Sequence, residues 1–161
     1  MPPPTLINLD ELDFNRVLYT REQIYQVLPQ RHEFSQLDAI IHLDIETGIM
    51  VGYRDVRSDE WWCRSHMPGK PIFPGILMVE ACAHLAAFGA SVFAPDPDGF
   101  MGFGGIDEAK FRDSVVPPAR IVLACRAVEV RKRRFICDAQ AYVGDKTVFE
   151  GRIIGLRLPW S

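Results

Sequence analysis

The sequence predicts an α+β fold in which one antiparallel β-sheet wraps around one long helix. Residues 74–93 form an almost wholly apolar segment, and a helix that is apolar on every side is enclosed by protein or by lipid. Three strand-like segments near the C-terminus are separated only by turns, so they must pair as an antiparallel meander. One long helix and a run of directly connected strands together define this class.

The chain length fits a single domain. Its 161 residues are 48% hydrophobic and carry a net charge of −3, so nothing favours nucleic acid or an anionic membrane as a partner. We expect one domain over residues 1–161, in which residues 1–19 form an extension that packs on the surface. The first residues lack the basic start and apolar run of a signal peptide, so we expect a cytoplasmic protein.

The first regular elements are a short helix and a hairpin. Thr20-Arg-Glu-Gln23 matches a capping box, which predicts a helix over residues 21–28 that ends at Pro29. Residues 38–46 alternate as a half-buried strand, with Ile41, Leu43 and Ile45 facing inward and His42 facing water. A turn at Glu46-Thr-Gly then leads into a second strand over residues 49–56.

The long helix carries very little polar chemistry. Apart from Cys82, its titratable side chains are Glu80 and His84, which interrupt it too much for a membrane span and favour a core helix. Burial favours the protonated form of a carboxyl group unless it is paired, so Glu80 is a candidate proton donor. Its alternative is a structural carboxylate bonded to backbone N–H groups or to His84, one turn away.

Strands dominate the rest of the chain. A loop at residues 95–99 precedes a glycine-rich strand over residues 100–106, and the meander follows over residues 121–130, 135–143 and 147–158. The cysteines show no CxxC or metal-type spacing, and we expect buried free thiols at all four positions: Cys63, Cys82, Cys125 and Cys137.

Three ordered blocks resemble the β-hydroxyacyl-acyl-carrier-protein dehydratases of the FabA/FabZ type, which adopt the hotdog fold. The signature of the family reads here His66-Met-Pro-Gly-Lys-Pro-Ile-Phe-Pro-Gly-Ile-Leu-Met-Val-Glu80. The other blocks are Leu28-Pro-Gln-Arg-His-Glu-Phe34 and Gly105-Ile-Asp-Glu-Ala-Lys-Phe-Arg-Asp-Ser-Val-Val-Pro117. Glutamate at position 80 resembles the FabZ branch. The family usually has glutamine where this chain has His84. Two interpretations stay open: the imidazole fills the hydrogen-bonding role of that glutamine, or it changes the acid strength of Glu80.

The resemblance implies the dehydration of a β-hydroxyacyl thioester on acyl carrier protein, without metal or organic cofactor. His66 is then the base, since an imidazole titrates near neutral pH. Glu80 protonates the leaving hydroxyl, and the free N–H of Gly75 on the first helical turn holds the thioester oxygen. The resemblance also implies that the two side chains of one site come from different subunits, so at least a homodimer is expected; many relatives are trimers of dimers.

Two further groups of residues are candidates on weaker grounds. The apolar side chains that could line an acyl tunnel are equally compatible with core packing: Phe34, Ile72, Phe73, Phe103 and Phe111. The basic side chains that could attract an acidic carrier protein are Lys110, Arg112, Arg131, Lys132, Arg133 and Arg134. For residues 131–134, a solvated turn is the alternative interpretation.

The alternatives are a hotdog thioesterase or hydratase that acts on coenzyme A esters, and a non-catalytic acyl-binding subunit. The upstream His-x-Pro-Gly counts against the thioesterase, and retention of His66 and Glu80 counts against the silent subunit. His66, Glu80 and His84 also have the side chains of metal ligands, but their spacing matches no metal-binding motif, so we expect no metal.

Overall fold

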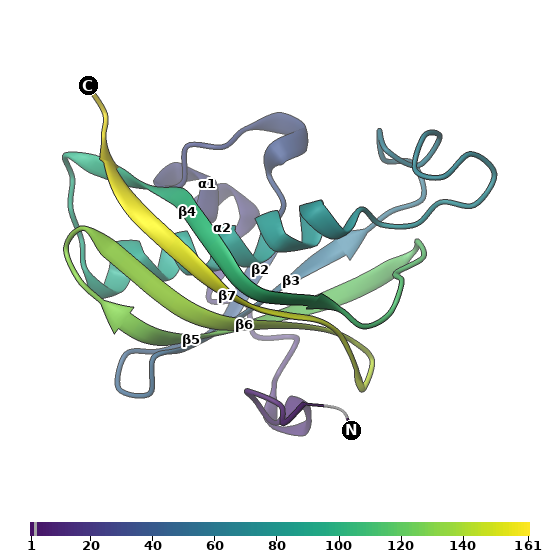
Figure 1. Ribbon diagram of the computed structural model, residues 1–161, viewed down its shortest axis with the longest axis horizontal. Coiled ribbons are helices and arrows are strands. Elements are labelled where there is room, and N and C mark those ends of the chain that lie inside the picture. The colour runs from purple at the N-terminus through teal and green to yellow at the C-terminus, as the bar shows by residue number, and fades with distance from the viewer. Residues whose placement is uncertain (2) are drawn as a thin grey trace.

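The computed structural model describes residue 1 and residues 3–161 as a curved seven-stranded sheet around one long helix (Figure 1). The sheet order is β1-β2-β3-β5-β6-β7-β4, and every neighbouring pair is antiparallel. The strands are β1 (Tyr19–Thr20), β2 (Ala39–Asp44), β3 (Ile49–Val56), β4 (Gly99–Phe111), β5 (Ala119–Val130), β6 (Arg134–Val143) and β7 (Lys146–Pro159). The predicted α+β fold is confirmed.

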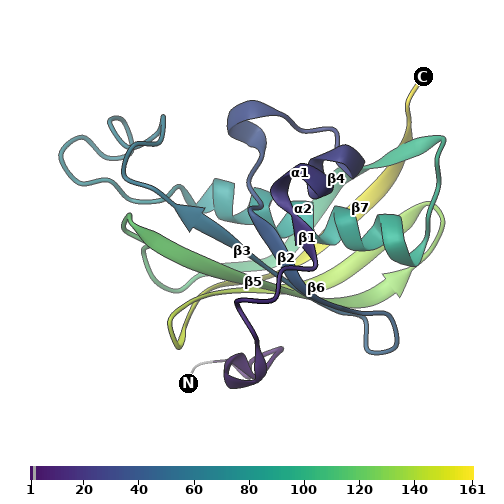
Figure 2. The ribbon, with the colours of Figure 1, turned by 180° about the vertical axis from the view of Figure 1, so that it is seen from behind.

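Helices lie on one face of this sheet. The short α1 (Arg21–Val27) and the long α2 (Gly75–Phe93) pack on the concave side, and Figure 2 shows α1 beside α2 from behind. The capping box at the start of α1 is confirmed, because Thr20 accepts from the Gln23 backbone N–H and the Gln23 side chain accepts from Thr20. Two 3-10 turns, Leu9–Glu11 and His32–Phe34, complete the elements.

The sheet holds α2 as a core helix. Eleven of its residues are buried, and it passes so close to β3 that a side chain on Gly89 would collide with Met50. Its length and hydropathy would suit a membrane span, but its buried hydrophobic residues belong to the main hydrophobic cluster inside the sheet. Ile76 in the first turn is an exception, since 78% of its surface is exposed in the single chain.

Of the three residues predicted to face inward from β2, Leu43 packs against the main core, but Ile41 and Ile45 do not. Ile40 packs into the main core and Ile41 into a second cluster on the outer face, whereas Ile45 is exposed beyond the end of the strand. A register shift between Ile40 and His42 breaks the alternation that the sequence suggests. His42 does face solvent, as predicted.

The N-terminal segment explains why β2 has apolar residues on both sides. Leu6, Leu9 and Phe14 pack against the second cluster on the outer face of the sheet. The Leu6 backbone N–H donates to Gln140 Oε1 at 2.8 Å, and Arg126 donates to the Leu6 carbonyl at 2.9 Å. This segment therefore covers the face of the sheet opposite α2.

The edge strand β4 is longer than predicted. It continues five residues beyond residue 106 and pairs with β7 through two register shifts, between Phe103 and Gly105 and between Asp107 and Lys110. The bulges bend the strand, and its second half lies beside the start of α2. Its other edge has no strand partner among the described residues, because β4 ends the sheet.

Candidate active site

His66 lies on the long loop between β3 and α2. Its backbone N–H donates to the Trp62 carbonyl at 2.8 Å, and its carbonyl accepts from Ile72 N–H at 2.9 Å. The imidazole Nδ1 lies 2.7 Å from the Ile72 carbonyl oxygen. Because a carbonyl only accepts, Nδ1 carries the proton and Nε2 presents a lone pair. In this geometry, Nε2 of His66 is available to accept a proton.

A buried ion pair anchors the start of the same loop. Arg54 on β3 contacts Glu60 at 2.5 Å, and their side chains are only 8% and 10% exposed. Glu60 also accepts from the indole N–H of Trp62 at 3.0 Å and from the backbone N–H of Arg57 at 2.7 Å. The Trp62 ring in turn packs edge-on against Phe73, just before α2. The His66 loop is thus fastened to the sheet and to the core.

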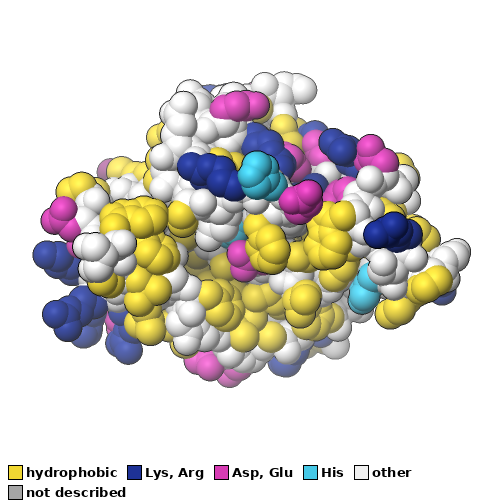
Figure 3. Space-filling model, turned by 90° about the horizontal axis from the view of Figure 1, so that it is seen from above, with side chains coloured by type: hydrophobic (Ala, Val, Ile, Leu, Met, Phe, Trp, Pro, Cys, Tyr) yellow, Lys and Arg dark blue, Asp and Glu magenta, His cyan; other side chains and the backbone are white. Residues whose placement is uncertain are grey.

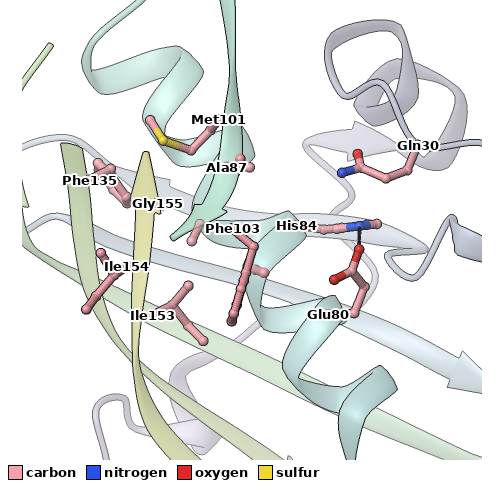
Figure 4. Close-up of a pocket in the computed structure, with 13 residues that line it drawn as sticks. Gln30, Glu80, His84, Ala87, Met101, Phe103, Phe135, Ile153, Ile154 and Gly155 are labelled. Carbon is pink, nitrogen blue, oxygen red and sulfur yellow. Dashed lines mark hydrogen bonds and ion pairs between the residues drawn. The ribbon is translucent and has the colours of Figure 1, made fainter. Parts of the chain in front are cut away.

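Glu80 is hydrogen-bonded rather than isolated. Its side chain projects from α2 and is 28% exposed, and Oε1 lies 2.9 Å from Nε2 of His84 (Figure 4). The other nitrogen of His84 lies 2.8 Å from the hydroxyl of Tyr25 on α1. The structure therefore shows the pairing with His84 that the helical spacing allows. Nothing in the sequence pattern indicates Tyr25 as the third member.

A pocket opens beside Glu80 along α2. Its wall combines Glu80 and His84 with residues of β4, β6 and β7, and Figure 4 shows their side chains around one space. The side-chain amide of Gln30 also lines it, and its buried oxygen Oε1 has no hydrogen-bond partner within the described residues. The sequence did not indicate Gln30 or most of the apolar wall: Ala83, Ala86, Ala87, Met101, Phe135, Ile153 and Ile154.

One of the five predicted tunnel residues, Phe103, lies in this pocket. Phe73 is buried in the core against Trp62, and Phe111 is half exposed and packs against Phe149. Ile72 belongs to the His66 loop through its two hydrogen bonds, and Phe34 is exposed on the second 3-10 turn. Of the five predicted tunnel residues, only Phe103 lines the same pocket as Glu80 within one chain.

Gly75 begins α2, and its backbone N–H has no hydrogen-bond partner among the described residues. A side chain at this position would meet the ring of Phe111 at 2.7 Å. Glycine at this position therefore allows the Phe111 ring of β4 to lie close over the first turn. The free N–H and the helix dipole can hold a developing negative charge.

The basic candidates fall into two places. Lys110 and Arg112 at the end of β4 both lie against Glu150, with the Lys110 nitrogen 4.0 Å from it. Residues 131–134 form the exposed turn between β5 and β6, where Arg131 and Arg134 pair with Glu129. Within the described residues, Lys132 and Arg133 take part in no ion pair.

The four cysteines are free and buried, as predicted. Burial raises the pKa of the Cys82 thiol well above its usual value, so this thiol is a poor nucleophile. In the part of the chain that the structure describes, no three His, Cys, Asp or Glu side chains are grouped as a metal site. His66 is also absent from the pocket beside Glu80, so one chain does not bring the two candidate catalytic groups into one pocket.

The comparisons with known proteins agree with this architecture. The fold matches one chain of a dehydratase heterocomplex from Xenorhabdus doucetiae with a TM-score of 0.72, at 10% identity, over 85% of this chain and 91% of that one. A thioesterase from Pseudomonas aeruginosa matches with a TM-score of 0.66, at 15% identity, over 89% and 97%. At these identities the likeness establishes the hotdog fold alone.

Sequence relatives are more specific. A 3-hydroxyacyl-[acyl-carrier-protein] dehydratase FabZ from Moorella thermoacetica is 33% identical over 81% of this chain and 91% of its own length. The FabZ of a Clostridium botulinum strain is 34% identical over 83% and 94%. The family model described as a FabA-like domain matches residues 28–152, from the end of α1 to the middle of β7. This chain therefore belongs to the FabA-like family.

Proposed function

We propose that this protein converts a β-hydroxyacyl thioester on acyl carrier protein to the trans-2-enoyl thioester by loss of water. The observation that carries the proposal is the bond between His66 Nδ1 and the Ile72 carbonyl, which leaves Nε2 as an available base. Membership of the FabA-like family and the FabZ relatives support the same reaction. The substrate class follows from the activity in the names of those relatives.

Three groups divide the chemistry. Nε2 of His66 takes the proton from the carbon next to the thioester carbonyl, while the N–H of Gly75 holds the enolate-like oxygen. Glu80 acts as the general acid that gives a proton to the β-hydroxyl, which departs as water and leaves the double bond. The apolar wall that includes Ala87, Phe135 and Ile153 suits the acyl chain. The reaction needs no redox change, and we assign it no cofactor.

We further propose that two copies of this chain build each site, with His66 from one and Glu80 from the other. Separate placement of the two side chains in one chain supports this, as does the free edge of β4. A band of hydrophobic side chains crosses the upper face of the molecule (Figure 3). Exposed Ile76, Phe103 and Phe111 would be covered if two β4 edges met.

We propose further that the protein is cytoplasmic and that it is a dehydratase, not a thioesterase. Free cysteines and FabZ relatives support a cytoplasmic enzyme. A thioesterase shares the fold, but the His-x-Pro-Gly signature that starts at His66 and the FabZ relatives favour the dehydratase. A non-catalytic subunit would have no need for this signature.

The function is tested by adding crotonyl thioester, linked to carrier protein or to coenzyme A, and following the loss of enoyl absorbance as water adds back. We expect hydration of both, with the higher kcat/KM for the carrier-linked form. Release of free thiol without hydration would indicate the thioesterase. No reaction with either substrate would indicate the non-catalytic subunit.

We expect the turn at residues 131–134 to attract the acidic carrier protein. Basic side chains gather at the left end of the face in Figure 3, where Figure 1 places this turn. The double reversal Lys132→Glu and Arg133→Glu should lower kcat/KM for carrier-linked substrate at low salt but not for an N-acetylcysteamine thioester, because rim charges act on encounter.

The matched control for this prediction is Lys146→Glu, which reverses an exposed charge at the start of β7, beside the turn at the opposite end of β6. It should leave both substrates unaffected. Equal losses in the control and the double variant, or no loss in either, would place carrier docking elsewhere, with Lys110 and Arg112 the next residues to test.

A further inference from the structure

A chain of three hydrogen bonds, two of them buried and the last partly buried, ends at Glu80. The Leu37 backbone N–H donates to the Tyr25 hydroxyl at 2.9 Å, this hydroxyl meets Nδ1 of His84 at 2.8 Å, and Nε2 of His84 meets Oε1 of Glu80 at 2.9 Å. Tyr25, Leu37 and His84 are all buried. The last bond is drawn in Figure 4, where His84 and Glu80 face the same pocket.

The Leu37 amide determines the direction of these bonds. An amide N–H can only donate, so the Tyr25 oxygen accepts from Leu37 and its own proton remains for His84. If Nδ1 of His84 carried a proton, the Tyr25 hydroxyl would have no acceptor among the described residues, and a buried donor without a partner is costly. Nδ1 therefore accepts, and Nε2 carries the proton that it donates to Glu80.

Tyr25 does not pass a proton along this chain. Burial raises the pKa of its hydroxyl well above the ordinary value, so the phenol keeps its proton. Tyr25 also lies outside the residues that line the pocket. Its effect on the reaction must therefore come through the orientation and tautomer of His84.

We propose that Tyr25 is a positioning residue, which locks His84 as the Nε2–H tautomer so that His84 holds Oε1 of Glu80 and leaves Oε2 for the β-hydroxyl of the substrate. The inference rests on the proposed function of Glu80. A glutamine at position 84 would donate from its amide without a third group. An imidazole can carry its proton on either nitrogen, so it needs Tyr25 to fix the donor.

The tautomer is tested on the free protein by ¹⁵N NMR of labelled histidine, because the protonated and bare ring nitrogens have well-separated shifts. His84 is assigned among the four histidines by its loss in His84→Gln. We expect Nε2 protonated in the wild type and a shift toward protonated Nδ1 in Tyr25→Phe. A wild-type His84 with protonated Nδ1 would overturn the proposal. This measurement needs no substrate, so it stands whether or not the dehydratase assay succeeds.

Kinetics separate positioning from folding. Tyr25→Phe should lower kcat for crotonyl thioester hydration between about 10-fold and 10²-fold, the cost of a misplaced catalytic group, with KM nearly unchanged. In the His84→Gln background the same change should cost little, since the glutamine amide donates to Glu80 by itself. The Leu37 N–H loses its acceptor in both backgrounds, so a purely structural role would cost the same in each. Equal losses in the two backgrounds would contradict the proposal.

Discussion

His66→Ala should lower the rate of dehydration by about 10²–10⁴-fold, the usual contribution of one acid–base group. The variant removes the Nε2 lone pair that the bond to the Ile72 carbonyl holds available. Hydration of carrier-linked crotonyl thioester measures the loss. The matched control is His42→Ala, which removes an exposed histidine on β2 and should leave the rate unchanged. Wild-type turnover in purified His66→Ala would end the assignment of His66 as the base.

Glu80→Gln should cause a loss of similar size, about 10²–10⁴-fold, because an amide cannot give up a proton as a carboxylic acid does. Its shape still fits beside Nε2 of His84, so the fold should be retained. An unchanged thermal unfolding curve checks that point. If the purified, folded variant kept most of its activity, the leaving hydroxyl would have to take its proton from another group.

Glu60→Gln should destabilise the fold by about 3 kcal/mol, because it leaves the Arg54 cation buried without its carboxylate partner. Asp38 lies farther from Arg54, at 3.6 Å, and only partly compensates. Urea unfolding followed by tryptophan fluorescence measures the change. The same variant should also lower activity, since Glu60 anchors the loop that carries His66.

The control for this prediction is Asp59→Asn in the neighbouring exposed pair. The Arg57 and Asp59 side chains are 70% and 74% exposed, and an exposed ion pair contributes little to stability. Asp59→Asn should therefore unfold at nearly the wild-type urea concentration. Equal midpoints for Glu60→Gln and Asp59→Asn would show that the buried pair does not anchor the loop.

Local signals in the sequence predicted most of the fold. The bounds of β3 agree at both ends, since the turn at Gly48, which has a φ of 71°, leads directly into its apolar run. The capping box placed α1, and the apolar composition placed α2 inside the sheet. In each case the pattern reflects contacts within the element or burial of the whole element, which a short window of residues records.

Contacts between distant segments could not be predicted in the same way. The N-terminal segment packs over Ile41 on the outer face of the sheet, so the inward orientation predicted for this residue of β2 is wrong. Tyr25 and His84 are 59 residues apart, and they meet only because α1 packs beside α2. The motif therefore indicated His66, Glu80 and Gly75 as candidates. It did not indicate Tyr25, which we propose orients His84 toward Glu80.

The central claim is that His66 of one copy and Glu80 of another form each site. Co-expression of His66→Ala and Glu80→Gln chains under two affinity tags, followed by isolation of the mixed dimer, tests it. We predict about half of the wild-type activity, because one of the two sites in a two-fold dimer then has both groups intact and the other has neither. Mixed dimers as inactive as either parent would contradict the claim and place both groups of each site on one chain.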